Sequence, residues 1–129
     1  SELFRSGLII PDENVFWYTT ETKENLFDDP EEVLKRLGDN TAVVCYNDEV
    51  AFGLVKCLLS AGRRVPEDVA VVSFDNSNLS WISQVPITSL SYEDRNIGRI
   101  AAQKLVDILD GRDVSSEVLP WTFIQKESS

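Results

Sequence analysis

Hydrophobic positions follow two alternating patterns along the chain. Short apolar runs rich in valine, at 42–46 and 69–74, end in polar turn residues, as is typical of strands buried on both faces of a parallel sheet. Longer stretches at 49–60 and 94–110 have apolar residues every three or four positions and a glycine just beyond, which predicts amphipathic helices. This alternation indicates an α/β fold with a mostly parallel sheet flanked by helices.

Six further elements are expected from the same signals. The strand segments carry β-branched and aromatic residues, whereas the helix segments have apolar residues at helical spacing. The expected strands cover 15–20, 87–92 and 118–124, and the expected helices cover 1–10, 23–37 with an interruption near Pro30, and 76–83. The alternative for the second of these helices is that Pro30 is its first position, after an aspartate cap.

Composition and charge narrow the class of protein. The 129 residues, 43% of them hydrophobic, are enough for one buried core. A net charge of −10 opposes binding to phosphate backbones and anionic membranes, so we expect no direct contact with DNA or a membrane. No apolar stretch approaches the ~20 residues that span a bilayer, and no segment resembling a signal peptide opens the chain. We therefore expect a soluble protein.

The residues that usually carry metal or cofactor chemistry are sparse. The chain has no histidine, and its two cysteines, Cys45 and Cys57, fall in a predicted buried strand and on the core side of a predicted helix. Structural thiols without a disulfide are expected, with no zinc site and no histidine-assisted nucleophile. None of the glycines forms a phosphate-binding loop, so we expect no cofactor and no bound metal.

Polar pairs follow the two valine-rich runs directly. These are Asn47-Asp48 and Asp75-Asn76, and the carboxyl ends of parallel strands form the edge where α/β sheets bind ligands. Amides and carboxylates that converge there suit a ligand rich in hydroxyl groups. The alternative is that these residues only cap the helices that follow them.

An aromatic segment, Phe16-Trp17-Tyr18, closes another expected strand at the same edge. An exposed aromatic ring there would pack against the C–H face of a sugar. Tyr18 is the residue we expect to be exposed, since it comes last and carries a polar hydroxyl, with Trp17 as the alternative. A core position for all three is the competing interpretation.

Two enzymatic interpretations find little support. Asp48 and Asp75 would form the acid and base of a glycosidase only at a defined separation, which the sequence does not establish. A phosphoacceptor receiver domain would need a cluster of acidic residues after the first strand and a matching lysine. We therefore expect a protein that is not an enzyme.

Three segments together resemble a known family. Residues 41–53, 62–76 and 86–90 are similar in order and spacing to the effector domain of lactose/galactose (LacI/GalR) repressors. Within that group, segments 19–24 and 45–49 look most like the arabinose-responsive repressors of Gram-positive bacteria, which join this domain to a winged-helix DNA-binding head.

The resemblance implies a type I periplasmic-binding-protein-like fold, with two α/β subdomains and a sugar in the cleft between them. This chain would be the C-terminal part. Residues 1–93 and 114–129 would form the C-terminal subdomain, and the helix within 94–113 would pack on an N-terminal subdomain that precedes the chain. Without that partner, we expect the helix to fold back onto its own sheet or to pack with another copy.

The family pattern also assigns roles to single residues. Asn47 and Asp75 match positions that bind sugar hydroxyls, and Ser73 stands where the family usually has glycine. The remaining positions that the resemblance implies for ligand binding are the stacking aromatic Tyr18, with Trp17 as the alternative, and the crossover residue Tyr92.

The implied function is the sensing of a small sugar, with L-arabinose the expected one, by a cytoplasmic transcriptional repressor. It would act as a homodimer, with contacts from helix 49–60 and the segment around Trp81, although an ordinary core position is the alternative for these residues. It would reach operator DNA through a head absent from this chain. The alternative function is the sugar-binding component of a transporter, which shares the fold.

Overall fold

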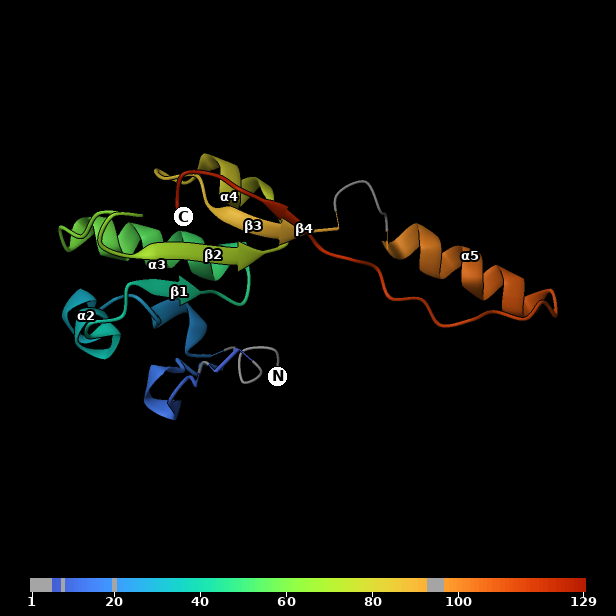
Figure 1. Ribbon diagram of the computed structural model, residues 1–129, viewed down its shortest axis with the longest axis horizontal. Helices are drawn as coiled ribbons and strands as arrows, with labels where there is room; N and C mark the ends of the chain where they lie inside the picture. The colour runs from blue at the N-terminus through green and yellow to red at the C-terminus, as the bar shows by residue number, and fades with distance from the viewer. Residues whose placement is uncertain (1–5, 8, 20, 93–96) are drawn as a thin grey trace.

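A four-stranded sheet forms the centre of the molecule (Figure 1). The computed structural model describes residues 6–7, 9–19, 21–92 and 97–129. The sheet order is β1-β2-β3-β4, with the first three strands parallel and β4 antiparallel to β3. This arrangement confirms the predicted α/β fold. The strands are β1 (Ala42–Val44), β2 (Ala70–Phe74), β3 (Thr88–Ser91) and β4 (Thr122–Ile124).

Helices α3, α4 and α5 lie close to their predicted bounds, whereas the helix predicted from residue 23 begins only at Pro30. The predicted interruption near Pro30 is the start of α2, where the Asp29 side chain accepts hydrogen bonds from the backbone N–H groups of Glu31 and Glu32. Most of the helix predicted over 1–10, and residue 94 at the predicted start of α5, lie outside the described residues. The helices are α2 (Pro30–Leu37), α3 (Asp48–Ser60), α4 (Asn78–Ile82) and α5 (Ile97–Leu109), with 3₁₀ turns at Asp12–Asn14 and Lys23–Asn25.

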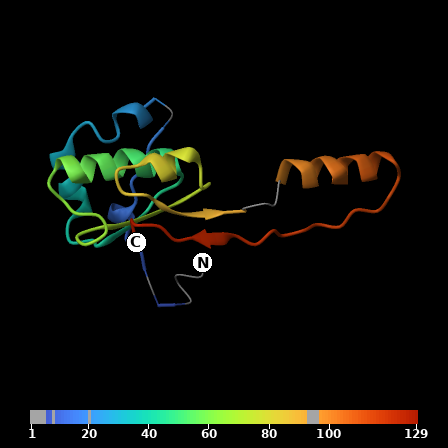
Figure 2. The same ribbon diagram turned by 90° about the horizontal axis from the view of Figure 1, so that it is seen from above.

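The hydrophobic core lies between α3 and one face of the sheet, and Figure 2 shows α3 and α4 along that face. The apolar stripe of α3 supplies buried residues at helical spacing, and they meet Val71 of β2 and Leu37 of α2. The stripe residues of α3 buried in this core are Val50, Leu54, Cys57 and Leu58.

In the described part of the chain, no helix is both long and apolar enough to cross a membrane.

Strand β1 departs from the prediction that its apolar run is buried on both faces. Val43 packs against the core, whereas Val44, the next residue, is 68% exposed. Successive side chains of a strand point to opposite faces, and the helices that pack on the core cover only the face of Val43. Burial of an apolar run on both faces needs a second covering layer, which strand composition alone does not provide.

The strand predicted over 15–20 is absent from the described residues 15–19. Phe16 lies beneath the guanidinium of Arg36, 3.9 Å from ring centroid to Cζ. Tyr18 is half-buried and packs against the core, whereas Trp17 is 84% exposed. The expectation that Tyr18 is the exposed aromatic is therefore wrong. Residues with high strand propensity form a strand only where a neighbouring strand is available for pairing. Here the segment is held by side-chain packing instead.

Helix α5 and the segment that returns from it project from the sheet as an arm (Figures 1 and 2). None of the residues of α5 is buried, so the helix does not fold back onto its own sheet. Packing with another copy stays a prediction. The large apolar side chains that the arm exposes are Ile97, Leu105, Val106, Ile108, Leu109 and Val118.

Candidate functional site

The carboxyl ends of the three parallel strands meet at one edge of the sheet, facing the arm (Figure 1). Asn47 follows β1, Asp75 follows β2 and Tyr92 follows β3. The structure therefore places these three predicted residues along a common rim, as expected for successive parallel strands. We call Asn47, Asp75, Tyr92 and the residues that contact them the rim.

Asn47 is the N-cap of α3. Its side-chain oxygen accepts a hydrogen bond of 3.0 Å from the backbone N–H of Val50, and the residue is half-buried. Asn47 therefore does cap the helix that follows it. Capping uses one lone pair of the amide oxygen and leaves the NH₂ group to act as a hydrogen-bond donor toward a ligand at the rim.

Asp75 is exposed and does not cap the helix that follows it. The N-cap position of α4 is Ser77, and Asp75 has a left-handed φ of 99°. Its backbone N–H donates a 2.9 Å hydrogen bond to the carbonyl of Leu90 in β3. A left-handed conformation is costly for an aspartate and often accompanies function. This backbone presents the Asp75 carboxylate to solvent at the rim.

Asp48 lies next to Asn47 but has a different environment. It is only 1% exposed, and its carboxylate accepts hydrogen bonds from Ser73 Oγ, from Ser89 Oγ at 2.8 Å and from the Ser77 backbone N–H. A carboxylate enclosed in this way is not available to a substrate. Asp48 and Asp75 therefore do not face a common ligand as a glycosidase pair would.

An aromatic pair at the rim was not expected from the sequence. The rings of Tyr92 and Trp121 are stacked with centroids 3.9 Å apart and an interplanar angle of 32°, and Phe74 meets Trp121 edge-on at 5.4 Å. Trp121 keeps 43% of its surface exposed. The signal that could have identified this pair is the antiparallel register of Ser91 with Thr122, which brings the neighbouring positions 92 and 121 together.

A further aromatic residue lies directly before the first turn of α3. Tyr46 is 77% exposed and directly precedes Asn47. It is an exposed aromatic that sequence reasoning missed. In the same turn Glu49 accepts a hydrogen bond from Lys23, which raises the pKa of Lys23. Tyr18 is half-buried and packs against the core.

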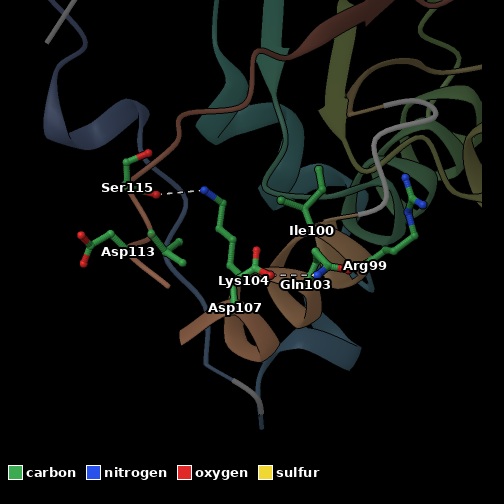
Figure 3. A pocket seen from close by; sticks show the side chains of 8 residues that line it. Arg99, Ile100, Gln103, Lys104, Asp107, Asp113 and Ser115 are labelled. Carbon is green, nitrogen blue, oxygen red and sulfur yellow. Dashed lines mark hydrogen bonds between the residues drawn. The ribbon is translucent and has the colours of Figure 1, made fainter. Parts of the chain in front are cut away.

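A groove of about 430 Å³ lies elsewhere, in the arm between α5 and the returning segment (Figure 3). Lys104 crosses it, donating to the Ser115 carbonyl at 2.9 Å and pairing with Glu117 at 3.2 Å. Gln103 and Asp107, on the same helix, are joined by a 3.0 Å hydrogen bond. All residues that line the groove belong to the arm, and none was predicted to bind a ligand.

Both cysteines are buried and free, as predicted. Burial raises the pKa of the Cys45 thiol to about 12 and also raises that of Cys57. Such thiols are protonated and unreactive at neutral pH.

Among the described residues, no cluster of three or more aspartate, glutamate, cysteine or histidine side chains is arranged to hold a metal ion.

A mostly parallel sheet with an exposed carboxylate, an amide and aromatic rings along its carboxyl edge defines an α/β domain of the kind that binds small molecules. The family model described as "Periplasmic binding protein-like domain" matches residues 6–129. The chain belongs to this family, in the form found in LacI-family transcriptional repressors.

Relatives and solved structures agree with this assignment. The chain is 32% identical over 109 residues to the arabinose metabolism transcriptional repressor of Halalkalibacterium halodurans, covering 81% of this chain and 28% of that protein. It is 35% identical over 78 residues to the repressor PurR of Vibrio atlanticus, covering 60% and 23%. The complex of the transcriptional regulator CelR with cellobiose superposes with a TM-score of 0.80 at 32% identity, covering 98% and 39%.

The chain spans about a quarter of the length of the curated relatives it matches. These relatives are transcriptional regulators, which gives indirect support to a role other than catalysis.

Proposed function

We propose that this chain is the sugar-binding part of the effector domain of a LacI-family transcriptional repressor. The observation that carries the proposal is the rim, where the exposed Asp75 carboxylate, the Asn47 amide and the stacked rings of Tyr92 and Trp121 lie along one sheet edge. A carboxylate and an amide suit sugar hydroxyls, and an indole face suits the C–H face of a sugar ring.

L-Arabinose is the proposed sugar. The similarity to an arabinose metabolism repressor supports it, together with the resemblance of segments 19–24 and 45–49 to arabinose-responsive repressors. The similarity to CelR, solved with cellobiose, makes this disaccharide the principal competitor. Tyr18 and Trp17 remain in the proposal as aromatic residues, with Tyr18 half-buried and Trp17 exposed.

The proposal includes the domain arrangement that the family implies. Residues 1–93 and 114–129 form the C-terminal subdomain, and the helix within 94–113 packs on an N-terminal subdomain, for which the exposed apolar face of α5 is the support. Sugar binding across the cleft then favours a closed state that alters the placement of DNA-binding heads in a dimer. The exposed Trp81 and Ile82 of α4 offer an apolar surface for that dimer.

A location in the cytoplasm follows from a role at operator DNA, and the two free buried thiols are compatible with it. DNA contact is assigned to a head outside this chain, because the chain itself carries a net charge of −10. The transcriptional regulators among the relatives favour a repressor over the sugar-binding component of a transporter.

A thermal-shift panel on the complete protein tests the function. L-Arabinose, other pentoses, hexoses and cellobiose are added singly, and a sugar at 100 times its dissociation constant adds about 2.7 kcal/mol to the free energy of unfolding. We expect L-arabinose to raise the melting temperature most. A larger rise with another sugar contradicts the choice of arabinose, and no rise with any sugar contradicts sugar sensing.

The variant Asp75→Ala tests the site by titration calorimetry. Loss of a charged acceptor in a closed cleft is expected to reduce sugar affinity by at least ~1.5 kcal/mol. The control is Asp68→Ala, which removes a carboxylate paired with Arg64 at the opposite end of β2 and is expected to leave affinity unchanged. Equal affinity of Asp75→Ala and the unaltered protein would refute the assignment.

A further inference from the structure

The backbone of the loop 75–77, which carries Asp75, is held by hydrogen bonds to several other parts of the chain. Three consecutive backbone N–H groups, from Asp75 to Ser77, each donate to a different acceptor. That of Asp75 bonds the Leu90 carbonyl, that of Asn76 bonds Ser89 Oγ at 3.0 Å, and that of Ser77 bonds the Asp48 carboxylate. Asp75 and Asn76 both have left-handed backbones, with φ of 99° and 51°. The bonds hold this conformation against its local cost.

Asp48 is the centre of this arrangement. Its two oxygens join α3, where the residue resides, to Ser73 of β2, to Ser89 of β3 and to the loop through Ser77. Charge-assisted hydrogen bonds to a buried carboxylate are stronger than neutral ones. Removing the acceptor would leave the buried hydroxyls of Ser73 and Ser89 without this partner in a region closed to water, and would free the Ser77 N–H from the carboxylate.

Lys126 holds the same loop through a side chain. Its ammonium donates to Asn76 Oδ1 at 2.8 Å, to Ser80 Oγ at 3.0 Å and to the Ile87 carbonyl at 2.8 Å. The Nζ atom also lies 4.4 Å from the ring centroid of Trp81. Burial lowers the pKa of Lys126, and the negative charge of Asp48 acts in the opposite direction. Asp48 and Lys126 therefore bond neighbouring residues of one loop, Ser77 and Asn76.

We propose that Asp48 and Lys126 are positioning residues that clamp the loop 75–77 at Ser77 and at Asn76 and thereby hold the Asp75 carboxylate where a sugar can meet it. The inference rests on the proposed function. It assigns ligand affinity to two side chains that need not touch the ligand, one of them almost completely buried. The clamp also links the start of α3, where Asn47 is the cap, to the loop of Asp75, so that the two polar residues of the rim are held in one hydrogen-bonded unit.

The chain provides a matched control for this proposal in Ser128. Its hydroxyl is completely buried and bonds the backbone of the same two strands, accepting from the Thr88 N–H at 2.9 Å and donating to the Val71 carbonyl. None of these bonds reaches the loop. Ser128→Ala therefore removes buried hydrogen bonds from β2 and β3 without altering the clamp.

The experiment compares Asp48→Asn, Lys126→Met and Ser128→Ala in the complete protein. Hydrogen exchange of the peptide that covers 75–77, followed by mass spectrometry, reports the order of the loop without any ligand. Titration with the sugar found in the thermal-shift panel reports affinity. Asp48→Asn keeps the size of the side chain while reducing its acceptor oxygens to one, so the variant has a good prospect of folding. Lys126→Met keeps an unbranched apolar side chain of similar length and removes the hydrogen-bond donors together with the charge that lies over Trp81.

We expect Asp48→Asn and Lys126→Met to speed exchange in the loop and to weaken sugar binding about tenfold, as one lost hydrogen bond would. Ser128→Ala is expected to change neither the exchange rate of the loop nor the sugar affinity, even if it lowers the melting temperature as much as the two clamp variants do. Faster exchange with unchanged affinity, or equal losses of affinity in all three variants, would overturn the proposal. A complete protein that binds no sugar refutes the proposed function instead, and the exchange rates then decide alone whether the clamp orders the loop.

Discussion

The indole ring of Trp121 stacks on the phenol ring of Tyr92, with centroids 3.9 Å apart. The two residues lie on the segments that leave β3 and enter β4, which are also the segments that connect the sheet to the arm (Figure 1). The pair therefore gives the rim an aromatic surface at the point where the arm begins. Because Tyr92 contacts Trp121, a sugar at the rim would meet the exposed part of the indole.

Trp121→Leu is expected to weaken sugar binding by about 1 kcal/mol, because an aliphatic side chain retains part of the apolar contact and loses the flat aromatic face. The control is Phe123→Leu, which alters an exposed aromatic residue two positions further along the chain, in β4. Calorimetric titration of both variants measures the difference. Similar affinities of the two variants would show that Trp121 is not part of the sugar site.

Asn47 has two roles that substitution can separate. Asn47→Asp keeps an oxygen that caps α3, so stability should be preserved, but it replaces the NH₂ donor that would face a sugar hydroxyl. Asn47→Ala should lose both the cap and the donor, and the lost cap should lower the free energy of unfolding by about 1 kcal/mol. Urea unfolding and calorimetry together test this. Sugar binding that survives Asn47→Asp unchanged would leave Asn47 as a helix cap only.

Gly53 lies in the middle of α3 because the ring of Phe27 packs against it. A Cβ at this position would be 2.7 Å from Phe27 Cδ2. Overpacking of this kind costs about 1–3 kcal/mol, while alanine returns about 1 kcal/mol of helix propensity, so Gly53→Ala should lower the free energy of unfolding by about 1 kcal/mol. In a Phe27→Leu background, where the side chain is no longer a planar ring, the same change should be neutral or stabilising. A double-mutant cycle of unfolding free energies checks this coupling.

The buried Cys45 thiol predicts a loss of stability at high pH. Its pKa is raised from 9.0 to about 12 by burial, so the protonated form is favoured in the folded state. Below pH 9 both states are protonated and the contribution is complete. Between pH 9 and 12 the unfolded chain releases the proton while the folded chain retains it, and stability falls by about 1.4 kcal/mol per pH unit.

Cys45→Ala should reduce this slope of the unfolding free energy against pH, and urea unfolding at several pH values measures it. The comparison with the variant isolates Cys45 from the other groups that titrate in the same range. Parallel slopes for the variant and the unaltered protein would contradict the prediction.

Local signals in the sequence were sufficient for much of the fold. The apolar period of α3, the Asp29 cap before Pro30 and the valine-rich run of β2 each depend on residues within a few positions of one another. The placement of Asn47 and Asp75 at one edge was also predictable, because successive parallel strands end on the same side of a sheet.

Tertiary contacts decided the remaining features. Whether Trp17 or Tyr18 is exposed depends on which ring packs against the core, and residues 15–19 form no strand because pairing needs a neighbour that local propensity does not supply. The Tyr92–Trp121 stack joins residues far apart in the chain, through the register of β3 with β4. The contrast between the buried Asp48 and the exposed Asp75 likewise depends on folding, because the hydroxyl groups that bond Asp48 come from β2 and β3.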